Sequence, residues 1–177
     1  MKTIDRKSLA ARIADVALLH GTFTLRSGRT STYYLDKYLF STQPEILSEL
    51  AALFAERIPD GTVRLAGAEL GGIPLVSAAS IETGLPCIFI RNSKKDYGTA
   101  KQLEGTLNEG DQVVLLEDVA TTGGQALEAA EIIQALGATV TKVIATIDRM
   151  EGASENFLEA GIPFEALFTK EDLGIRE

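Results

Sequence analysis

An apolar run that leads directly into two carboxylates and a glycine-rich turn constrains the fold of this chain more than any other segment. It reads VVLLEDVATTGGQ and occupies residues 113–125. The four aliphatic residues 113–116 suit a strand of a sheet that is covered on both faces. An amphipathic run, 126–136, follows the glycines. The segment therefore predicts a strand, a tight turn and a helix, which is the repeating unit of an α/β fold.

The same segment carries groups that suit a sugar phosphate. Glu117 and Asp118 stand at the carboxyl end of the predicted strand, where open α/β sheets bind their ligands. The 121–125 turn brings backbone N–H groups and the positive end of a helix to the same edge. Carboxylates beside a phosphate cradle suit a ligand with vicinal hydroxyls and a phosphate, and a ribose 5-phosphate is the obvious candidate.

Strand-like and helix-like segments alternate along the rest of the chain. Aliphatic spacing predicts helices at 8–19, 45–57, 74–83, 126–136 and 154–160, and apolar runs predict strands at 63–66, 87–90, 113–116, 140–147 and 164–168. This alternation predicts βαβ units and a central, mostly parallel sheet flanked by helices. We expect a single domain over 1–177, with a small N-terminal hood of about residues 1–40 at the edge of the sheet. His20 is expected to close the first helix.

Composition narrows the class of protein. The net charge of −8 argues against a general nucleic-acid binder, because affinity for phosphate backbones comes from clustered lysine and arginine. No apolar run reaches the roughly 18 residues of a membrane span, and the N-terminus lacks the pattern of a signal peptide. The single cysteine, Cys87, lies in an apolar run and is expected in the core. These features predict a cytoplasmic protein with no nucleic-acid or membrane partner.

The segment FTLRSGRTSTYYLD, residues 23–36, combines charge with aromatic rings. Arg26 and Arg29 flank a Ser-Gly turn, and two tyrosines follow. Such a set can hold an anionic planar ring. A β-hairpin with exposed arginines explains the residues equally well, so both interpretations stay open.

Two loops follow predicted strands and carry possible ligand contacts. In GAELGGIPL, residues 67–75, Gly71 and Gly72 allow backbone amides to approach a ligand closely, although a plain strand-to-helix turn also uses glycine. The segment 91–105 is polar and long for a compact domain. It is either a solvated loop or a lid that closes over a polyphosphate, and its cations favour the lid; they are Arg91, Lys94, Lys95 and Lys101.

Four common phosphate-binding, metal-binding or catalytic arrangements are excluded. The chain has no Lys-Ser or Lys-Thr after its glycines, as a P-loop requires, and no Gly-x-Gly-x-x-Gly. The single histidine, His20, excludes histidine-based metal sites and catalytic triads.

The motif VVLLEDVATTGG is similar to the phosphoribosyl-diphosphate binding motif of type I phosphoribosyltransferases. The remaining motifs, including IDRMEGA at 147–153, resemble the orotate phosphoribosyltransferases in the order of that family. The resemblance implies the type I phosphoribosyltransferase fold, with a hood and a mobile lid loop of about 91–108. It also implies transfer of ribose 5-phosphate from phosphoribosyl diphosphate to N1 of orotate in pyrimidine biosynthesis. Mg²⁺ is the implied cofactor, held mainly by the substrate with no direct protein ligand, and a homodimer with shared active sites is the implied assembly.

The resemblance also implies roles for individual residues. Catalysis would involve Lys95, Arg91 and Asp118, and orotate would contact Arg26, Thr121 and Arg149. The residues implied in binding phosphoribosyl diphosphate are Glu117, Asp118, Val119, Ala120, Thr121, Thr122, Gly123, Gly124, Gln125, Gly71, Gly72, Arg91, Lys94, Lys95 and Tyr97.

The chain departs from the usual family pattern at several of these positions. Arg26 replaces a lysine, Tyr97 replaces a histidine, and Asn92 replaces a lysine. Leu70 and Gly71 stand where Tyr-Lys is common. Two alternatives remain open, namely a phosphoribosyltransferase for another base and a non-catalytic sensor of phosphoribosyl diphosphate. Arg149 favours an acidic pyrimidine, and the charge of −8 counts against a nucleic-acid-binding regulator.

Overall fold

The computed structural model describes residues 4–24, 30–93 and 102–176. Its centre is a six-stranded sheet with the strand order β5-β4-β3-β6-β7-β8. The only antiparallel pairing among these described strands joins β4 to β5, and the other neighbours run parallel. The predicted α/β fold with a mostly parallel sheet is therefore confirmed. The strands are β3 (Arg64–Ala68), β4 (Cys87–Ile90), β5 (Leu103–Glu104), β6 (Gln112–Ala120), β7 (Thr139–Asp148) and β8 (Phe164–Thr169).

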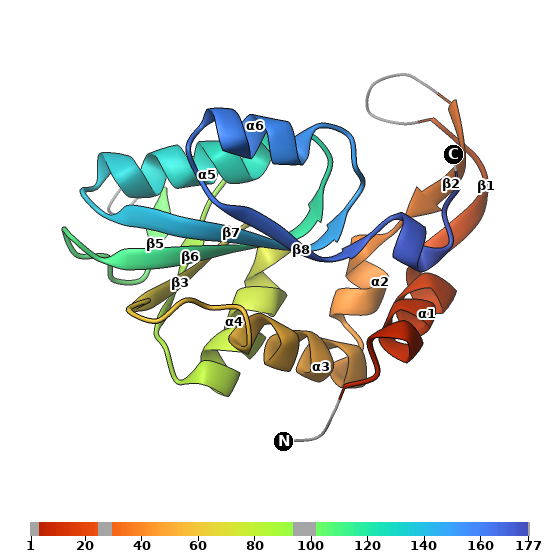
Figure 1. Ribbon diagram of the computed structural model, residues 1–177, viewed down its shortest axis with the longest axis horizontal. Helices are drawn as coiled ribbons and strands as arrows, with labels where there is room; N and C mark the ends of the chain where they lie inside the picture. Colours follow the sequence, from red (N-terminus) through yellow and green to blue (C-terminus); the bar gives the residue numbers. More distant parts are fainter. Residues whose placement is uncertain (1–3, 25–29, 94–101, 177) are drawn as a thin grey trace.

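Helices cover both faces of the sheet (Figure 1). On one face lie α3 (Pro44–Ala55) and α4 (Gly72–Thr83), and on the other lie α5 (Gly124–Ala135) and α6 (Ala153–Glu159). The central strand β6 contributes to both cores: Val114 and Leu116 pack into the cluster that contains α3 and α4. Val113 and Leu115 pack into the cluster that contains α5 and α6. Burial on both faces explains why this part of the sequence is uninterrupted by polar residues.

The N-terminal segment forms a separate layer at one end of the main sheet (Figure 1). It consists of α1 (Arg6–Ala17), the antiparallel pair β1 (Leu18–Thr24) and β2 (Thr30–Leu35), and the short helix α2 (Lys37–Ser41). The carboxylate of Asp5 caps α1 by accepting hydrogen bonds from the N–H groups of Lys7 and Ser8. The C-terminal 3₁₀ turn η1 (Glu171–Leu173) packs against α1, so the two ends of the described chain close this layer together.

The predicted helices and strands match the observed ones closely, but several differences remain. The first helix ends at Ala17, so the prediction that His20 closes it is wrong; His20 lies in β1 and pairs with Tyr33. Apolar residues continue past Ala17, and their spacing alone does not distinguish a helix from the edge strand that follows. The helix α2 and the strand β5 were not predicted, and β5 falls within the range predicted for the lid. None of the described helices is long and apolar enough to cross a membrane.

Parallel pairing has a consequence for the motifs. The strands β3, β4, β6 and β7 all end at the same edge of the sheet, which we call the carboxyl edge. The segments that follow them begin at Glu69, Arg91, Thr121 and Arg149. Four stretches that are distant in sequence therefore emerge side by side.

The α5–α6 face provides a test of packing near this edge. Phe157 is fully buried, and its ring stacks on Phe164 with centroids 4.7 Å apart. It also lies against Gly123, where an added Cβ would meet the Phe157 ring at 2.7 Å. We expect Phe157→Ala to lower the free energy of unfolding by about 3–5 kcal/mol, because it leaves a cavity in this core. Urea denaturation measures this change, and Leu158→Ala is the matched control because Leu158 is 80% exposed. Equal effects of the two substitutions would contradict the assigned core.

Candidate active site

Hydrogen bonds join the four loops at the carboxyl edge. The Arg149 N–H donates to the carbonyl of Ala120 at 2.9 Å, which ties the loop after β7 to the end of β6. The Glu69 N–H donates to the carbonyl of Ile90 at 2.8 Å, which ties the loop after β3 to the end of β4. The predicted motifs at 67–75, 117–125 and 147–153 therefore share one surface of the molecule.

The carboxylates of Glu117 and Asp118, called here the acid pair, lie at the end of β6 and are almost completely buried. Asp118 Oδ1 accepts a hydrogen bond of 2.5 Å from the Val119 N–H. Glu117 Oε1 accepts one of 3.3 Å from the Asp118 N–H, while Glu117 Oε2 has no hydrogen-bond partner among the described residues. A buried oxygen of this kind is costly unless a ligand satisfies it.

Asp118 Oδ2 lies between two other elements. Lys37 Nζ of α2 is 2.8 Å away and forms an ion pair with it. On another side is the Gly71 backbone, where an added Cβ would lie 1.4 Å from Oδ2. Glycine at position 71 is therefore required by the placement of Asp118. The peptide bond between Glu69 and Leu70, just before this contact, is cis.

The charges of Lys37 and the acid pair influence one another. Burial raises the pKa of Glu117 well above its ordinary value, and the charge of Asp118 and a hydrogen bond with it raise it further, against a lowering effect of Lys37. For Lys37, burial works to lower the pKa, but the attraction of Asp118 and its hydrogen bond outweigh burial, and the net pKa is raised. Lys37 is therefore cationic near neutral pH, and Glu117 resists ionisation.

The 121–125 turn forms an open helix N-terminus next to the acid pair. Gly123 adopts a left-handed conformation, with φ of +76°, and begins α5 without a side-chain cap. Thr121 and Thr122 are exposed, and Asn156 Nδ2 of α6 holds the turn by donating to the carbonyl of Thr122 at 2.8 Å. A helix N-terminus with free N–H groups attracts an anion, as the sequence predicts for this turn.

A polar junction connects this turn to the two neighbouring loops. Gln125 Nε2 donates to the carbonyl of Glu69 at 2.8 Å and to Asn92 Oδ1 at 3.0 Å. The Asn92 N–H in turn donates to Glu69 Oε1 at 2.7 Å. The departure at Asn92 thus has a structural role, because its amide side chain and backbone join three of the four loops.

Arg149 is oriented by the N-terminal layer. Its Nη2 donates to the Tyr33 hydroxyl at 3.0 Å and pairs with Glu151 Oε1 at 3.0 Å, and its guanidinium lies 5.6 Å from the centroid of the Tyr33 ring. The next residue, Met150, has a φ of +57°, and its N–H donates to Asp148 Oδ1 at 2.7 Å. This turn presents a guanidinium at the carboxyl edge.

The structure also describes two of the remaining predicted site residues, Arg91 and Gly72. Arg91 follows β4, and its Nη1 lies 4.0 Å from Glu104 Oε1 of β5. Gly72 begins α4 and packs against the Leu116 carbonyl. The predictions for Arg26, Lys94, Lys95 and Tyr97 lie outside the described residues. Sequence reasoning did not single out Lys37, because a lone lysine in an otherwise ordinary helix start carries no pattern.

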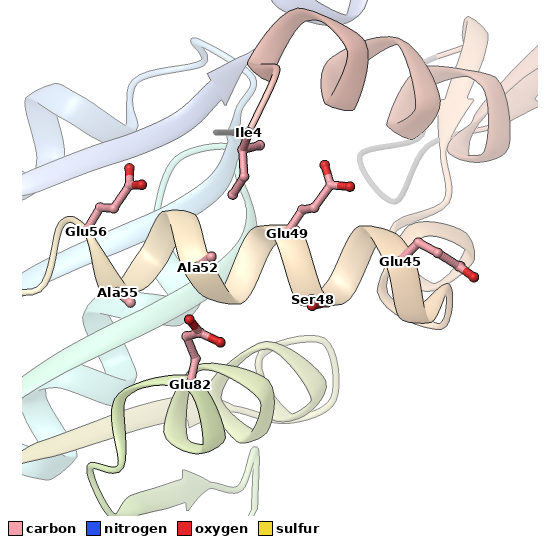
Figure 2. A pocket seen from close by; sticks show the side chains of 8 residues that line it. All are labelled: Ile4, Glu45, Ser48, Glu49, Ala52, Ala55, Glu56 and Glu82. Carbon is pink, nitrogen blue, oxygen red and sulfur yellow. The ribbon is translucent and has the colours of Figure 1, made fainter. Parts of the chain in front are cut away.

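A pocket away from the carboxyl edge is unsuited to a phosphate-bearing ligand. Figure 2 shows it beside α3, with Ile4 and α4 completing the walls, and its volume is about 610 Å³. The carboxylates that line it are those of Glu45, Glu49, Glu56 and Glu82. None of its described lining residues belongs to the four loops, and four carboxylates repel a phosphate-bearing ligand.

The fold, with an acid pair in β6 followed by the 121–125 turn, is that of a phosphoribosyltransferase of type I. A model of the phosphoribosyl transferase domain family matches residues 40–157. The orotate phosphoribosyltransferase of Halobacterium salinarum is 46% identical over 173 residues, which cover 98% of this chain and 98% of that protein. This chain belongs to the orotate phosphoribosyltransferase family.

Solved structures agree with this assignment. The orotate phosphoribosyltransferase of Mycobacterium tuberculosis superposes with a TM-score of 0.88 at 30% identity, covering 97% of this chain and 100% of that chain. A structure of that enzyme in complex with 5-phospho-α-D-ribosyl 1-diphosphate superposes with a TM-score of 0.83 at 28% identity, with the same coverage.

The raised pKa of Glu117 predicts a pH dependence of stability. Between its ordinary pKa of 4.5 and the raised value, the folded protein binds more protons at this group than the unfolded chain does. The contribution of Glu117 to the free energy of unfolding therefore falls as the pH rises through that range. We expect Glu117→Gln to remove this contribution, so the variant gains stability relative to the wild-type protein as the pH rises above about 4.5.

Chemical denaturation at a series of pH values measures this difference. Glu131→Gln on the exposed side of α5 is the control, and its difference from the wild-type protein should not change with pH in this way. A pH-independent difference for Glu117→Gln would show that the burial of the carboxyl is not costly.

Proposed function

We propose that this protein transfers ribose 5-phosphate from phosphoribosyl diphosphate to N1 of orotate, giving orotidine 5′-monophosphate and diphosphate. The observation that supports this most directly is the arrangement at the carboxyl edge. A buried acid pair adjoins an open helix N-terminus, and the guanidinium of Arg149 lies at the same edge. Membership of the orotate phosphoribosyltransferase family supports orotate as the acceptor substrate.

The donor would bind through the acid pair and the 121–125 turn. Ribose hydroxyls would donate to Glu117 and Asp118, which offer buried carboxylate oxygens, including one with no hydrogen-bond partner among the described residues. The 5-phosphate would accept hydrogen bonds from the N–H groups at the start of α5. Val119 and Ala120 would then lie beneath the ribose, and the backbone at Gly71 and Gly72 would face the diphosphate.

The acceptor would bind through its carboxylate. Arg149 presents a guanidinium fork that is already fixed by Tyr33, and a planar carboxylate matches this fork. Glu151 now occupies part of the fork and would yield to the substrate carboxylate. Thr121 and Arg26 are proposed as further contacts to orotate.

The chemistry depends on where charge develops. As the C1–O bond breaks, the ribose gains oxocarbenium character and the diphosphate gains negative charge. Lys95 and Arg91 are proposed to stabilise the leaving diphosphate. Mg²⁺ would be held mainly by oxygens of the substrate, where it would offset part of the diphosphate charge.

A spectrophotometric assay of orotate consumption tests the proposed function. The purified protein is supplied with phosphoribosyl diphosphate and Mg²⁺, then with excess chelator, and orotate is replaced in turn by uracil, hypoxanthine and adenine. We expect turnover with orotate alone and its loss on chelation. Turnover of a purine would favour a transferase for another base, and donor binding without any turnover would favour a sensor.

Arg149→Lys tests the acceptor site. The substitution keeps the charge but removes the planar fork, so we expect the KM for orotate to rise about 10- to 100-fold while the KM for phosphoribosyl diphosphate changes little. Steady-state kinetics with each substrate varied in turn separate the two constants. Arg12→Lys is the control, since Arg12 pairs with Glu49 on the surface away from the four loops. A rise confined to the donor KM would contradict the assigned role.

Lys95→Ala tests the proposed stabilisation of the leaving group. We expect kcat to fall about 10²- to 10³-fold with the fold retained, as is typical for the loss of one well-placed donor. Circular dichroism checks the fold, and near-normal turnover would exclude the role. If the protein is a homodimer in which Lys95 serves the neighbouring site, mixing Lys95→Ala with Arg149→Lys subunits should restore part of the activity. No recovery in such hybrids would argue for self-contained sites.

A further inference from the structure

Lys37 connects the N-terminal layer to the acid pair. It is the first residue of α2, and Asp36 fixes the start of this helix by accepting a hydrogen bond from the Tyr38 N–H. Its Nζ lies 2.8 Å from Asp118 Oδ2, and the Asp118 side chain is only 1% exposed. The resemblance to known families assigns no role to this lysine.

The contact fixes the orientation of Asp118. Its Oδ1 accepts from the Val119 N–H, and its Oδ2 lies between Lys37 and the backbone of Gly71. Each carboxylate oxygen therefore has a defined neighbour, so rotation of the side chain would break one contact or produce a clash. Preorganisation of this kind keeps a binding group in place before the ligand arrives.

The contact also balances charge. Asp118 and Glu117 are buried side by side, and the Gly71 turn between 67 and 72 carries no cation of its own. A donor with a phosphate and a diphosphate brings several negative charges to this place. An ionised and unpaired Asp118 would repel it, whereas a protonated one would lose its capacity to accept from both ribose hydroxyls. The raised pKa of Lys37 is consistent with a cation that is held in place by the acid pair.

We propose that Lys37 is a positioning residue for the donor substrate, which acts through Asp118 by holding this carboxylate beside Gly71 and neutralising it. The inference rests on the proposed function, since it assigns to Asp118 the ribose hydroxyls of a phosphoribosyl donor. It goes beyond that function by giving α2, in the N-terminal layer, a part in donor binding. Lys37 itself need not touch the donor.

Calorimetric binding of phosphoribosyl diphosphate with Mg²⁺ tests this proposal without depending on turnover. Lys37→Met removes the charge at similar length, and we expect it to raise the Kd for the donor by about tenfold or more. Lys37→Arg keeps the charge and should restore most of the affinity. Lys142→Met is the matched control: Lys142 Nζ pairs with Glu165 at 2.6 Å on a comparably covered side chain that lies outside the four loops, and the donor Kd should not change.

A double-mutant cycle distinguishes action through Asp118 from direct contact with the donor. If Lys37 acts through Asp118, Lys37→Met should change the donor Kd by less than about twofold when Asp118→Asn is already present. An equal loss of affinity in both backgrounds would overturn the proposal, as would an unchanged Kd for Lys37→Met alone. If Lys37→Met does not fold, Lys37→Gln replaces it, and wild-type affinity in that variant also overturns the proposal.

A failure of the proposed reaction and a failure of the proposed role of Lys37 give different experimental results. Absence of orotate turnover by the wild-type protein would refute the proposed reaction and leave the donor Kd values interpretable. Normal orotate turnover together with an unchanged donor Kd in Lys37→Met would refute only the role of Lys37.

Discussion

The burial of two adjacent carboxylates at the end of β6 is the constraint on which the rest of the site depends. Glu117 and Asp118 are withdrawn from water by the layers on both faces of the sheet, and burial of this kind penalises their ionised forms. The surrounding elements offset this penalty with an ion pair from α2 and with N–H groups of β6. The N-terminal layer therefore contributes a positive charge to the site and also covers one end of the sheet.

Different elements of the fold position the different parts of the site. The acid pair and the 121–125 turn come from one continuous segment, so their relative geometry follows from a single strand, turn and helix. Arg149 belongs to the next βα unit and reaches its position through the Ala120 carbonyl and the Tyr33 hydroxyl. The N-terminal layer contributes to both parts, because Lys37 of α2 pairs with Asp118 and the Tyr33 hydroxyl of β2 accepts from Arg149.

The sequence allowed the elements and the acid pair to be predicted because both depend on local patterns. Apolar runs and helical spacing located the strands of the main sheet other than β5 to within a few residues, and Glu117 with the glycine turn marked the carboxyl edge. The end of α1 at Ala17 was missed because β1 continues the apolar pattern of the helix. The partnership of Lys37 with Asp118 was missed for a different reason. It joins residues 81 positions apart, through a helix of five residues that has no periodicity to recognise.

The departure at Gly71 illustrates how a local substitution is explained only by distant contacts. In the sequence it is the loss of a lysine that is common in the family. In the structure, any side chain at position 71 would meet Asp118 Oδ2 at 1.4 Å, so glycine there and the present orientation of Asp118 require each other. Lys37 approaches the same oxygen from α2, and the cation that the turn lacks is therefore present at this point from another element. Electrostatic balance at the acid pair constrains the two positions together, so a lysine returned to position 71 would require Asp118 to move away from Lys37.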